Sequence, residues 1–221
     1  MRRKLVNITG ALGWKFLKDG DVWGLNDCRP GFDQGVLEDY NVTAWFQMHP
    51  REAWEGGRNG TEHVAWLKEK HSFPVYMQSN HSDVPAAKAY PLSGVSKLWP
   101  FATPVRFSDT FCYMIGLAIT MGYKAIHLAG VFLANDIEAW AEAPAVASWA
   151  TIASTRGIDV TEQPARLFPP FRYGYERRLP EPFVREEVAA QMLIDESNPW
   201  RRVRSWHSYL RALWLDGKVA E

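Results

Sequence analysis

The sequence predicts an α/β protein with a Rossmann-like, three-layer fold, in which helices cover both faces of a mostly parallel sheet and further helices follow at the C-terminus. Two observations indicate this class. Short apolar runs that end in turn residues alternate with segments of helical periodicity, which is typical of βαβ units. The chain has 221 residues, of which 47% are hydrophobic and 23% charged, so it can bury one sizeable core.

The individual elements follow from local signals. The predicted strands are residues 4–10, 21–27, 40–50, 73–78, 125–130 and 158–163. Helical spacing is found at residues 61–71 and 136–156, and residues 79–104, rich in Pro, Ser and Ala, are expected to form a long surface loop.

A further helix is predicted to begin near residue 108. Ser108 or Asp109 can cap it, because a short side-chain oxygen satisfies the unpaired amides of a first helical turn. Gly122 is a suitable stop, since glycine adopts the left-handed conformation without strain. One apolar face is formed by Phe111, Met114, Ile115 and Ala118.

We expect residues 1–180 to form a nucleotide-binding domain and residues 181–221 to form a helical appendage packed on it. The last helical pattern, 199–215, combines tryptophans with arginines. Three interpretations are open: a packed helix with a solvated basic face, a homodimer contact, or a surface for a phosphate-rich acceptor such as nucleic acid or anionic lipid.

Composition excludes several classes of protein. The formal net charge is zero, so no global field steers the chain towards nucleic acid or membrane. Cys28 and Cys112 are too few for a disulfide framework. No run approaches the roughly 20 apolar residues of a membrane span, and no signal peptide is evident, so a cytoplasmic protein is expected. The 11 tryptophans are either core residues or stacking platforms for a sugar or base.

The carboxyl ends of the predicted strands identify candidate ligand-binding residues. In an open α/β sheet, ligands bind outside these ends, near the N-termini of helices. The rule selects Gly10, Asn26, Asp27, His49, Gln78, Gly130 and the turn at 106–109.

The start of the helix near residue 108 adds a candidate anion site. Its amides and positive dipole would favour a phosphate, and Arg106 lies beside Ser108 and Asp109. The alternative is an ordinary N-cap with a surface arginine.

Two residues are candidates for proton transfer. His49 follows a strand, where an imidazole can deprotonate a hydroxyl near neutral pH, although a hydrogen-bonded strand-end histidine would have the same sequence. Glu138 opens a helix, where the dipole favours a carboxylate with or without a catalytic role. Histidine spacings predict no metal site built from the protein alone.

The segment "VRFSDTFCYMIGLAITMGYKAIHLAGVFL" (105–133) resembles bacterial sialyltransferases of the Campylobacter type and the related MptE-like (DUF115) proteins, which include phage members and a hydroxymethylpterin pyrophosphokinase. The segment "VWGLND" (22–27) is similar to the second strand of that group. The matching positions in the first segment are Tyr113, Met114, Ala118, Gly122, Tyr123, Lys124, Ile126, Leu128 and Gly130.

The resemblance implies a nucleotide-dependent transferase, foremost a glycosyltransferase that moves a sugar from a CMP- or UDP-type nucleotide-sugar to an unknown hydroxyl acceptor. It implies that Asn26 contacts the nucleotide, that Ser108 and Asp109 contact its ribose or base side, and that the loop of Gly10 and Gly13 approaches the phosphates.

Two alternatives stay open. One is a pyrophosphokinase of the pterin-kinase type, using ATP and Mg²⁺ held by carboxylates such as Asp27 or Asp109. The other is a binding or structural protein of phage origin that has lost catalysis.

The sequence also departs from the pattern of that group. The first loop reads "GALGWK" (10–15) without the usual Pro-Ser, although Gly10 and Gly13 still permit close backbone approach. Val131 replaces an expected aspartate, and no histidine lies between residues 128 and 206, where the sialyltransferases carry their general base. These departures favour the inactive alternative.

Overall fold

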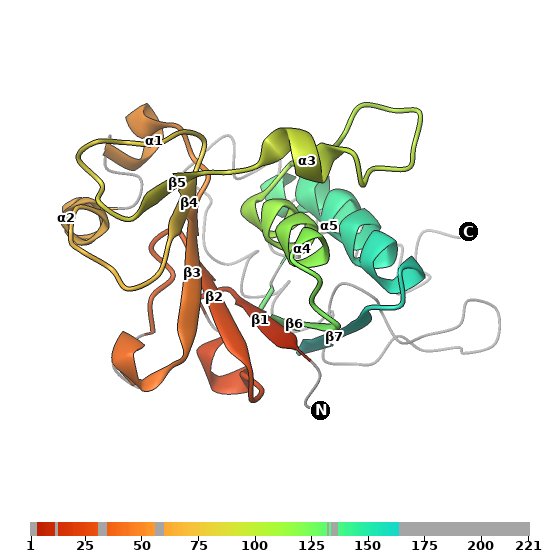
Figure 1. Ribbon diagram of the computed structural model, residues 1–221, viewed down its shortest axis with the longest axis horizontal. Helices are drawn as coiled ribbons and strands as arrows, with labels where there is room; N and C mark the ends of the chain where they lie inside the picture. Colours follow the sequence, from red (N-terminus) through yellow and green to blue (C-terminus); the bar gives the residue numbers. More distant parts are fainter. Residues whose placement is uncertain are drawn as a thin grey trace, which may run out of the picture. The chain divides into compact units, whose positions relative to one another are not determined.

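The computed structural model describes residues 4–11, 13–30, 35–55, 60–131, 133 and 137–163. These residues form an α/β, Rossmann-like fold around one seven-stranded sheet in the order β5-β4-β3-β2-β1-β6-β7 (Figure 1). Every neighbouring pair of strands is parallel. The strands are β1 (Leu5–Thr9), β2 (Asp21–Leu25), β3 (Val42–Gln47), β4 (Val75–Met77), β5 (Ala87–Ala89), β6 (Ala125–Ala129) and β7 (Asp159–Gln163).

Helices occupy the connections between strands. Short 3₁₀ turns, η1 (Trp14–Phe16) and η2 (Leu37–Asp39), follow β1 and β2. The α-helices are α1 (Arg51–Glu55), α2 (Thr61–Leu67), α3 (Leu92–Ser96), α4 (Thr110–Thr120) and α5 (Ile137–Thr155). Gly122 and Gly157, which follow α4 and α5, have φ of 73° and 75° and so supply the left-handed residues that end them.

The direction of winding changes between β1 and β6. From β1 the chain proceeds outward through β2, β3, β4 and β5, and then returns to the other side of β1 to add β6 and β7. β1 and β6 pair in register from Leu5 with Ala125 to Thr9 with Ala129. Their carboxyl ends therefore form the topological switch point, where open α/β sheets bind ligands.

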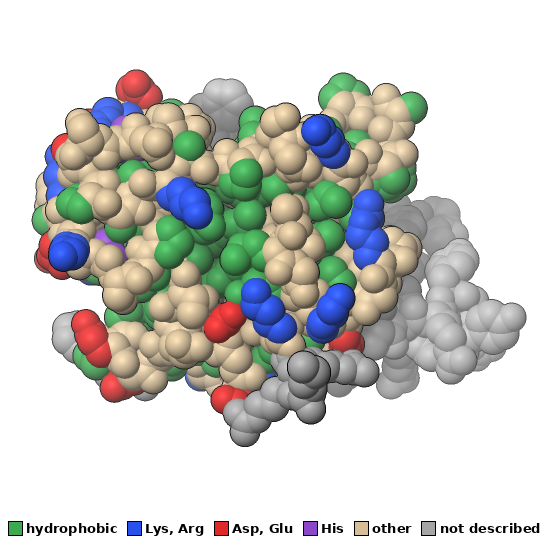
Figure 2. Space-filling model, in the orientation of Figure 1, with side chains coloured by type: hydrophobic (Ala, Val, Ile, Leu, Met, Phe, Trp, Pro, Cys, Tyr) green, Lys and Arg blue, Asp and Glu red, His purple; other side chains and the backbone are tan. Residues whose placement is uncertain are grey.

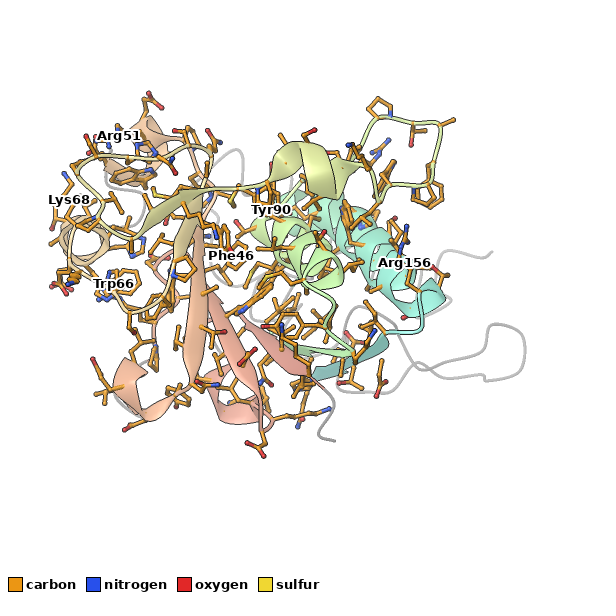
Figure 3. The ribbon with its side chains drawn as sticks, in the orientation of Figure 1. Phe46, Arg51, Trp66, Lys68, Tyr90 and Arg156 are labelled. Carbon is orange, nitrogen blue, oxygen red and sulfur yellow. The ribbon has the colours of Figure 1, made fainter. Side chains whose placement is uncertain are left out.

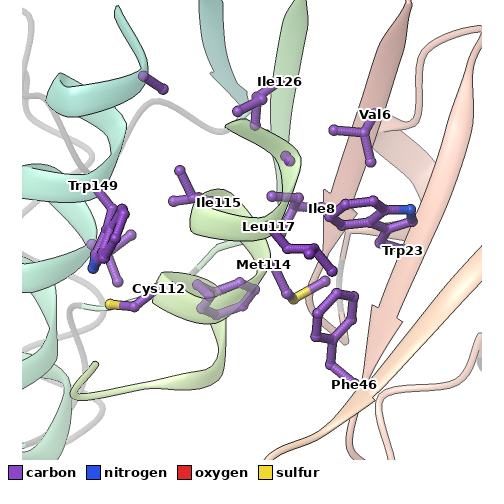
Figure 4. Packing of buried hydrophobic residues seen from close by; sticks show 14 of the residues in the cluster. Val6, Ile8, Trp23, Phe46, Cys112, Met114, Ile115, Leu117, Ile126 and Trp149 are labelled. Carbon is purple, nitrogen blue, oxygen red and sulfur yellow. The ribbon is translucent and has the colours of Figure 1, made fainter. Parts of the chain in front are cut away.

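The larger core lies between the sheet and helices α3, α4 and α5. Helix α4 packs beside α5 on this face of the sheet: its Met114 and Leu117 face Phe46 and Trp23, and Ile115 lies on the side of Trp149 (Figure 4). In the space-filling view of this face, hydrophobic side chains fill the hollow between the strands and α4, with lysines and arginines around it (Figure 2).

The second core lies on the opposite face of the sheet, under α1, α2 and η1, and is built around Trp45. Figure 3 shows the division: Trp66 projects from α2 on this side, whereas Phe46 and Tyr90 lie on the α4 side. Six described tryptophans are at most 8% exposed, which makes them core residues and not stacking platforms; they are Trp14, Trp23, Trp45, Trp54, Trp66 and Trp149.

The described structure confirms the fold class and six predicted strands and corrects one expectation. Residues 79–104 are not one long loop, because they contain the edge strand β5 and helix α3. The strand was missed because its three residues, Ala-Lys-Ala, are half-buried or exposed and carry no apolar alternation. The predicted domain boundary at 180, the appendage 181–221 and its homodimer contact lie outside the described residues.

Candidate functional site at the carboxyl edge of the sheet

The glycine loop after β1 packs directly against the end of β6. The amide of Gly10 donates to the Ala129 carbonyl at 3.0 Å, and a Cβ atom at Gly10 would lie 2.7 Å from the Gly130 carbonyl oxygen. A Cβ atom at Gly13 would lie 2.1 Å from the Ala129 oxygen. Gly130 itself has φ of 62°. The structure therefore brings Gly10, Gly13 and Gly130 together at the switch point, and the contact requires glycine.

Asn26 directly follows β2, in a conformation that asparagine tolerates better than most residues. Its φ is 47°, the sole positive value at a non-glycine position in the described part of the chain. Its amide donates to the Phe46 carbonyl at 2.8 Å, and its carbonyl accepts from the Trp45 indole at 2.9 Å. Its side-chain Oδ1 is buried and has no hydrogen-bond partner. Buried polar atoms are nearly always hydrogen-bonded, so this oxygen is a position where a water molecule or a ligand can donate.

A hydrogen bond connects the loops that follow β1 and β2, close to Asn26 in the sequence. The Trp14 indole donates to the Cys28 carbonyl at 2.8 Å, which fixes the segment that contains the exposed Asp27. Burial, together with the negative charge of Asp27, raises the pKa of the Cys28 thiol to about 11, so this thiol stays protonated at neutral pH. Cys28 and Cys112 are both free cysteines.

The helix start at residue 108 differs from the anion site that the sequence predicted. Asp109 is the N-cap of α4, and its carboxylate accepts hydrogen bonds from the amides of Phe111 and Cys112. The amides expected to receive a phosphate are therefore occupied by a negative charge. Ser108 and Arg106 are exposed, and the Arg106 carbonyl accepts from the Trp149 indole at 2.8 Å. The simple N-cap interpretation describes this turn.

His49 belongs to a chain of three hydrogen-bonded side chains at the end of β3. The fully buried Gln47 contacts His49 Nδ1 through Nε2 at 3.2 Å and His63 Nε2 through Oε1 at 2.8 Å. His63, from α2, is 1% exposed, and its Nδ1 atom has no partner. Burial lowers the pKa of His63 to about 4, so its ring is neutral at physiological pH.

Sequence reasoning found His49 but missed Gln47 and His63. Gln47 is the last residue of the apolar strand β3, and His63 lies on a helix 16 residues away. A glutamine two positions before a strand-end histidine is the one local signal, because residues i and i+2 of a strand face the same way.

Glu138, the other candidate for proton transfer, lies in the first turn of α5, and its side chain is not among those that the structure describes.

Neither a metal-binding cluster nor a membrane-spanning helix occurs in the described part of the chain. No cluster of three or more histidine, cysteine or acidic side chains that could hold a metal ion occurs among the described residues. Within the same residues, no helix is both long and apolar enough to cross a membrane.

Comparison with known proteins gives structural likeness at low identity. No family model matches the chain, and no curated protein matches it. The sialyltransferase CST-II in complex with a trisaccharide acceptor and CMP is 15% identical, with a TM-score of 0.42, over 72% of this chain and 80% of that one.

Two further solved structures are of the same enzyme. CstII from Campylobacter jejuni with the substrate analogue cytidine-5'-monophosphate is 16% identical, with a TM-score of 0.43, over 75% of this chain and 82% of that one. A CST-II variant with CMP is 16% identical, with a TM-score of 0.45, over 72% and 81% of the two chains. At these values the likeness assigns no residue role and no activity to this chain.

Proposed function

We propose that this protein is a glycosyltransferase that uses a CMP-type nucleotide-sugar donor and transfers the sugar to a hydroxyl acceptor. The donor lies across the carboxyl ends of β1, β2 and β6. The proposal combines the resemblance of residues 105–133 to sialyltransferases with the arrangement of side chains at this edge.

The observation that carries the proposal is the unpartnered Oδ1 of Asn26. A buried acceptor without a donor costs about 1–3 kcal/mol, so it favours a ligand that supplies one. The ribose hydroxyls and the exocyclic amine of a cytidine nucleotide are donors of this kind. The left-handed backbone of Asn26, held by Trp45 and Phe46, places the carboxamide at the strand end before any ligand arrives.

The glycine loop supports the position of the phosphates. Gly10 and Gly13 bring the loop against the backbone of Ala129 and Gly130, which fills the space that a side chain would take, so we place the phosphates beside this closely packed turn at the switch point. Because the α4 amides of Phe111 and Cys112 are capped by Asp109, the phosphates belong on the side of Gly10 and not at that helix start.

Glycosyl transfer requires two further contributions. Negative charge that develops on the leaving nucleotide must be stabilised, and the attacking hydroxyl must lose its proton. We propose His49, at the end of β3, for the first task and Glu138, at the start of α5, for the second.

Calorimetric titration of the full chain with CMP, UDP, GDP and Mg-ATP tests the proposal. We expect CMP to bind and the other three to bind at least about tenfold more weakly, a difference of about 1.4 kcal/mol. Release of CMP from a CMP-sugar in the presence of hydroxyl acceptors would then establish turnover. A folded protein that binds none of these nucleotides, or prefers Mg-ATP, would contradict the proposal.

The variant Asn26→Gly isolates the carboxamide. Glycine keeps the left-handed backbone at no steric cost, so the fold should be retained while CMP affinity falls about tenfold. Asn41→Gly is the matched control, because Asn41 is an exposed asparagine at the amino edge of the sheet, where it bonds Gly20 and Asp21. Equal loss of affinity in both variants would remove Asn26 from the site.

A further inference from the structure

The contact of Gln47 with two histidines constrains where each ring carries its proton. A neutral imidazole has one N–H donor and one acceptor nitrogen, whereas a carboxamide has a donor end and an acceptor end. Gln47 Oε1 can only accept, so the 2.8 Å contact requires a proton on His63 Nε2. Gln47 Nε2 can only donate, so the 3.2 Å contact requires a lone pair on His49 Nδ1.

Rotating the carboxamide by half a turn would reverse both assignments, and the surroundings of His63 decide between the two. In the observed orientation the buried, unpartnered Nδ1 of His63 carries a lone pair. In the reversed orientation the same atom would carry an N–H with no acceptor. Buried N–H groups without a partner are rarer in proteins than acceptors in that state, so the observed orientation is favoured.

We propose that Gln47 is a positioning residue that fixes His49 and His63 in the tautomer protonated on Nε2, so that His49 acts as a hydrogen-bond donor and not as a general base. A ring with its proton on Nε2 cannot accept another proton at that atom, and its Nδ1 lone pair is engaged by Gln47. The general-base role that the sequence suggested for His49 is thereby replaced.

The tautomers follow from the hydrogen bonds alone, whereas the catalytic role of His49 rests on the proposed function. When the bond between sugar and phosphate breaks, the phosphate oxygen keeps the electron pair and becomes more negative. An Nε2–H donor stabilises that charge without transferring its proton. The proton of the attacking hydroxyl then goes to a carboxylate, for which the sequence offers Glu138.

Nitrogen NMR of histidine-labelled full-length protein tests the tautomers without any nucleotide. Long-range ¹⁵N–¹H spectra at pH 8 distinguish the protonated ring nitrogen from the lone-pair nitrogen, and His49→Gln and His63→Gln assign the signals. We expect Nε2–H on both rings in the unaltered protein. An Nδ1–H tautomer at His49 would overturn the inference, whether or not the protein binds CMP.

The variant Gln47→Glu gives an asymmetric prediction. A carboxylate has two acceptor oxygens and no donor. His63 should therefore keep its Nε2–H, whereas His49 should change to the Nδ1–H tautomer, which should exceed its Nε2–H tautomer by about tenfold or more. Gln78→Glu is the matched control, because Gln78 lies at the end of the adjacent strand, is exposed, and bonds the Met48 carbonyl. It should leave both tautomers unchanged. A tautomer of His49 that does not respond to Gln47→Glu would contradict the positioning role. If that variant does not fold, the tautomer of His49 measured in the unaltered protein still tests the inference.

Discussion

The indole of Trp45 donates a hydrogen bond to the backbone carbonyl of Asn26 at 2.9 Å, which links the second core of the protein to the left-handed residue at its candidate site. Trp45 is completely buried, and its ring also packs on Trp66 at a centroid distance of 4.9 Å. The position of Asn26 is thus determined by packing on the α2 side of the sheet, away from the switch point itself.

The substitution Trp45→Phe should weaken both stability and nucleotide binding. Phenylalanine keeps an aromatic core residue but removes the donor to Asn26, which should cost about 2 kcal/mol in urea unfolding. Trp23→Phe is the matched control, because it removes an indole bond to the Thr43 hydroxyl and leaves Asn26 untouched. Only Trp45→Phe should lower CMP affinity in calorimetry. An equal effect of both variants on binding would show that Trp45 acts through global stability alone.

The glycine loop should tolerate no side chain at Gly13. In Gly13→Ala the new Cβ atom would overlap the Ala129 carbonyl and the Thr9 hydroxyl, 2.1 and 2.2 Å away, so we expect a loss of about 3 kcal/mol of unfolding free energy. Gly94→Ala, in α3, meets no atom within 4 Å and should be neutral or slightly stabilising. Thermal unfolding of the two variants beside the unaltered protein checks this. A mild effect at Gly13 would mean that the loop can move away from β6.

Local signals were sufficient to predict most of the sheet and the start of α4. Apolar runs that end in turn residues identified six of the seven strands, because buried parallel strands leave a strong local pattern. Asp109 was one of the two capping candidates, because capping depends on residues within one turn.

Contacts between distant segments could not be predicted from the sequence. A capping aspartate and a phosphate-binding helix start have the same sequence signature, and only the hydrogen bonds of Asp109 separate them. The bond between Gln47 and His63 joins β3 to α2 and leaves no periodic pattern. The unpartnered state of Asn26 Oδ1 likewise depends on what surrounds it in space.

Removing the cap of α4 should destabilise the protein moderately. Asp109→Ala leaves the amides of Phe111 and Cys112 without their acceptor, at an expected cost of about 1 kcal/mol. Asp109→Asn retains a side-chain oxygen and should recover most of that loss. If Asp109→Ala instead strengthens CMP binding by freeing these amides, the phosphates would lie at this helix start and not beside Gly10.

The buried His63 should make stability depend on pH in a defined window. Its pKa is about 4 in the folded protein and about 6.5 when unfolded, so between these values the unfolded chain binds a proton that the native chain does not. Stability should therefore fall as the pH drops from about 6.5 to about 4, by at most about 1.4 kcal/mol per pH unit, and this contribution should level off at lower pH. Urea unfolding at intervals across the window measures it. His63→Gln should reduce the slope in that range, leaving the part that comes from His127, whose pKa burial also lowers, and the acid unfolding that carboxylates cause below it. Parallel pH profiles for the variant and the unaltered protein would show instead that a proton reaches His63 easily in the folded state.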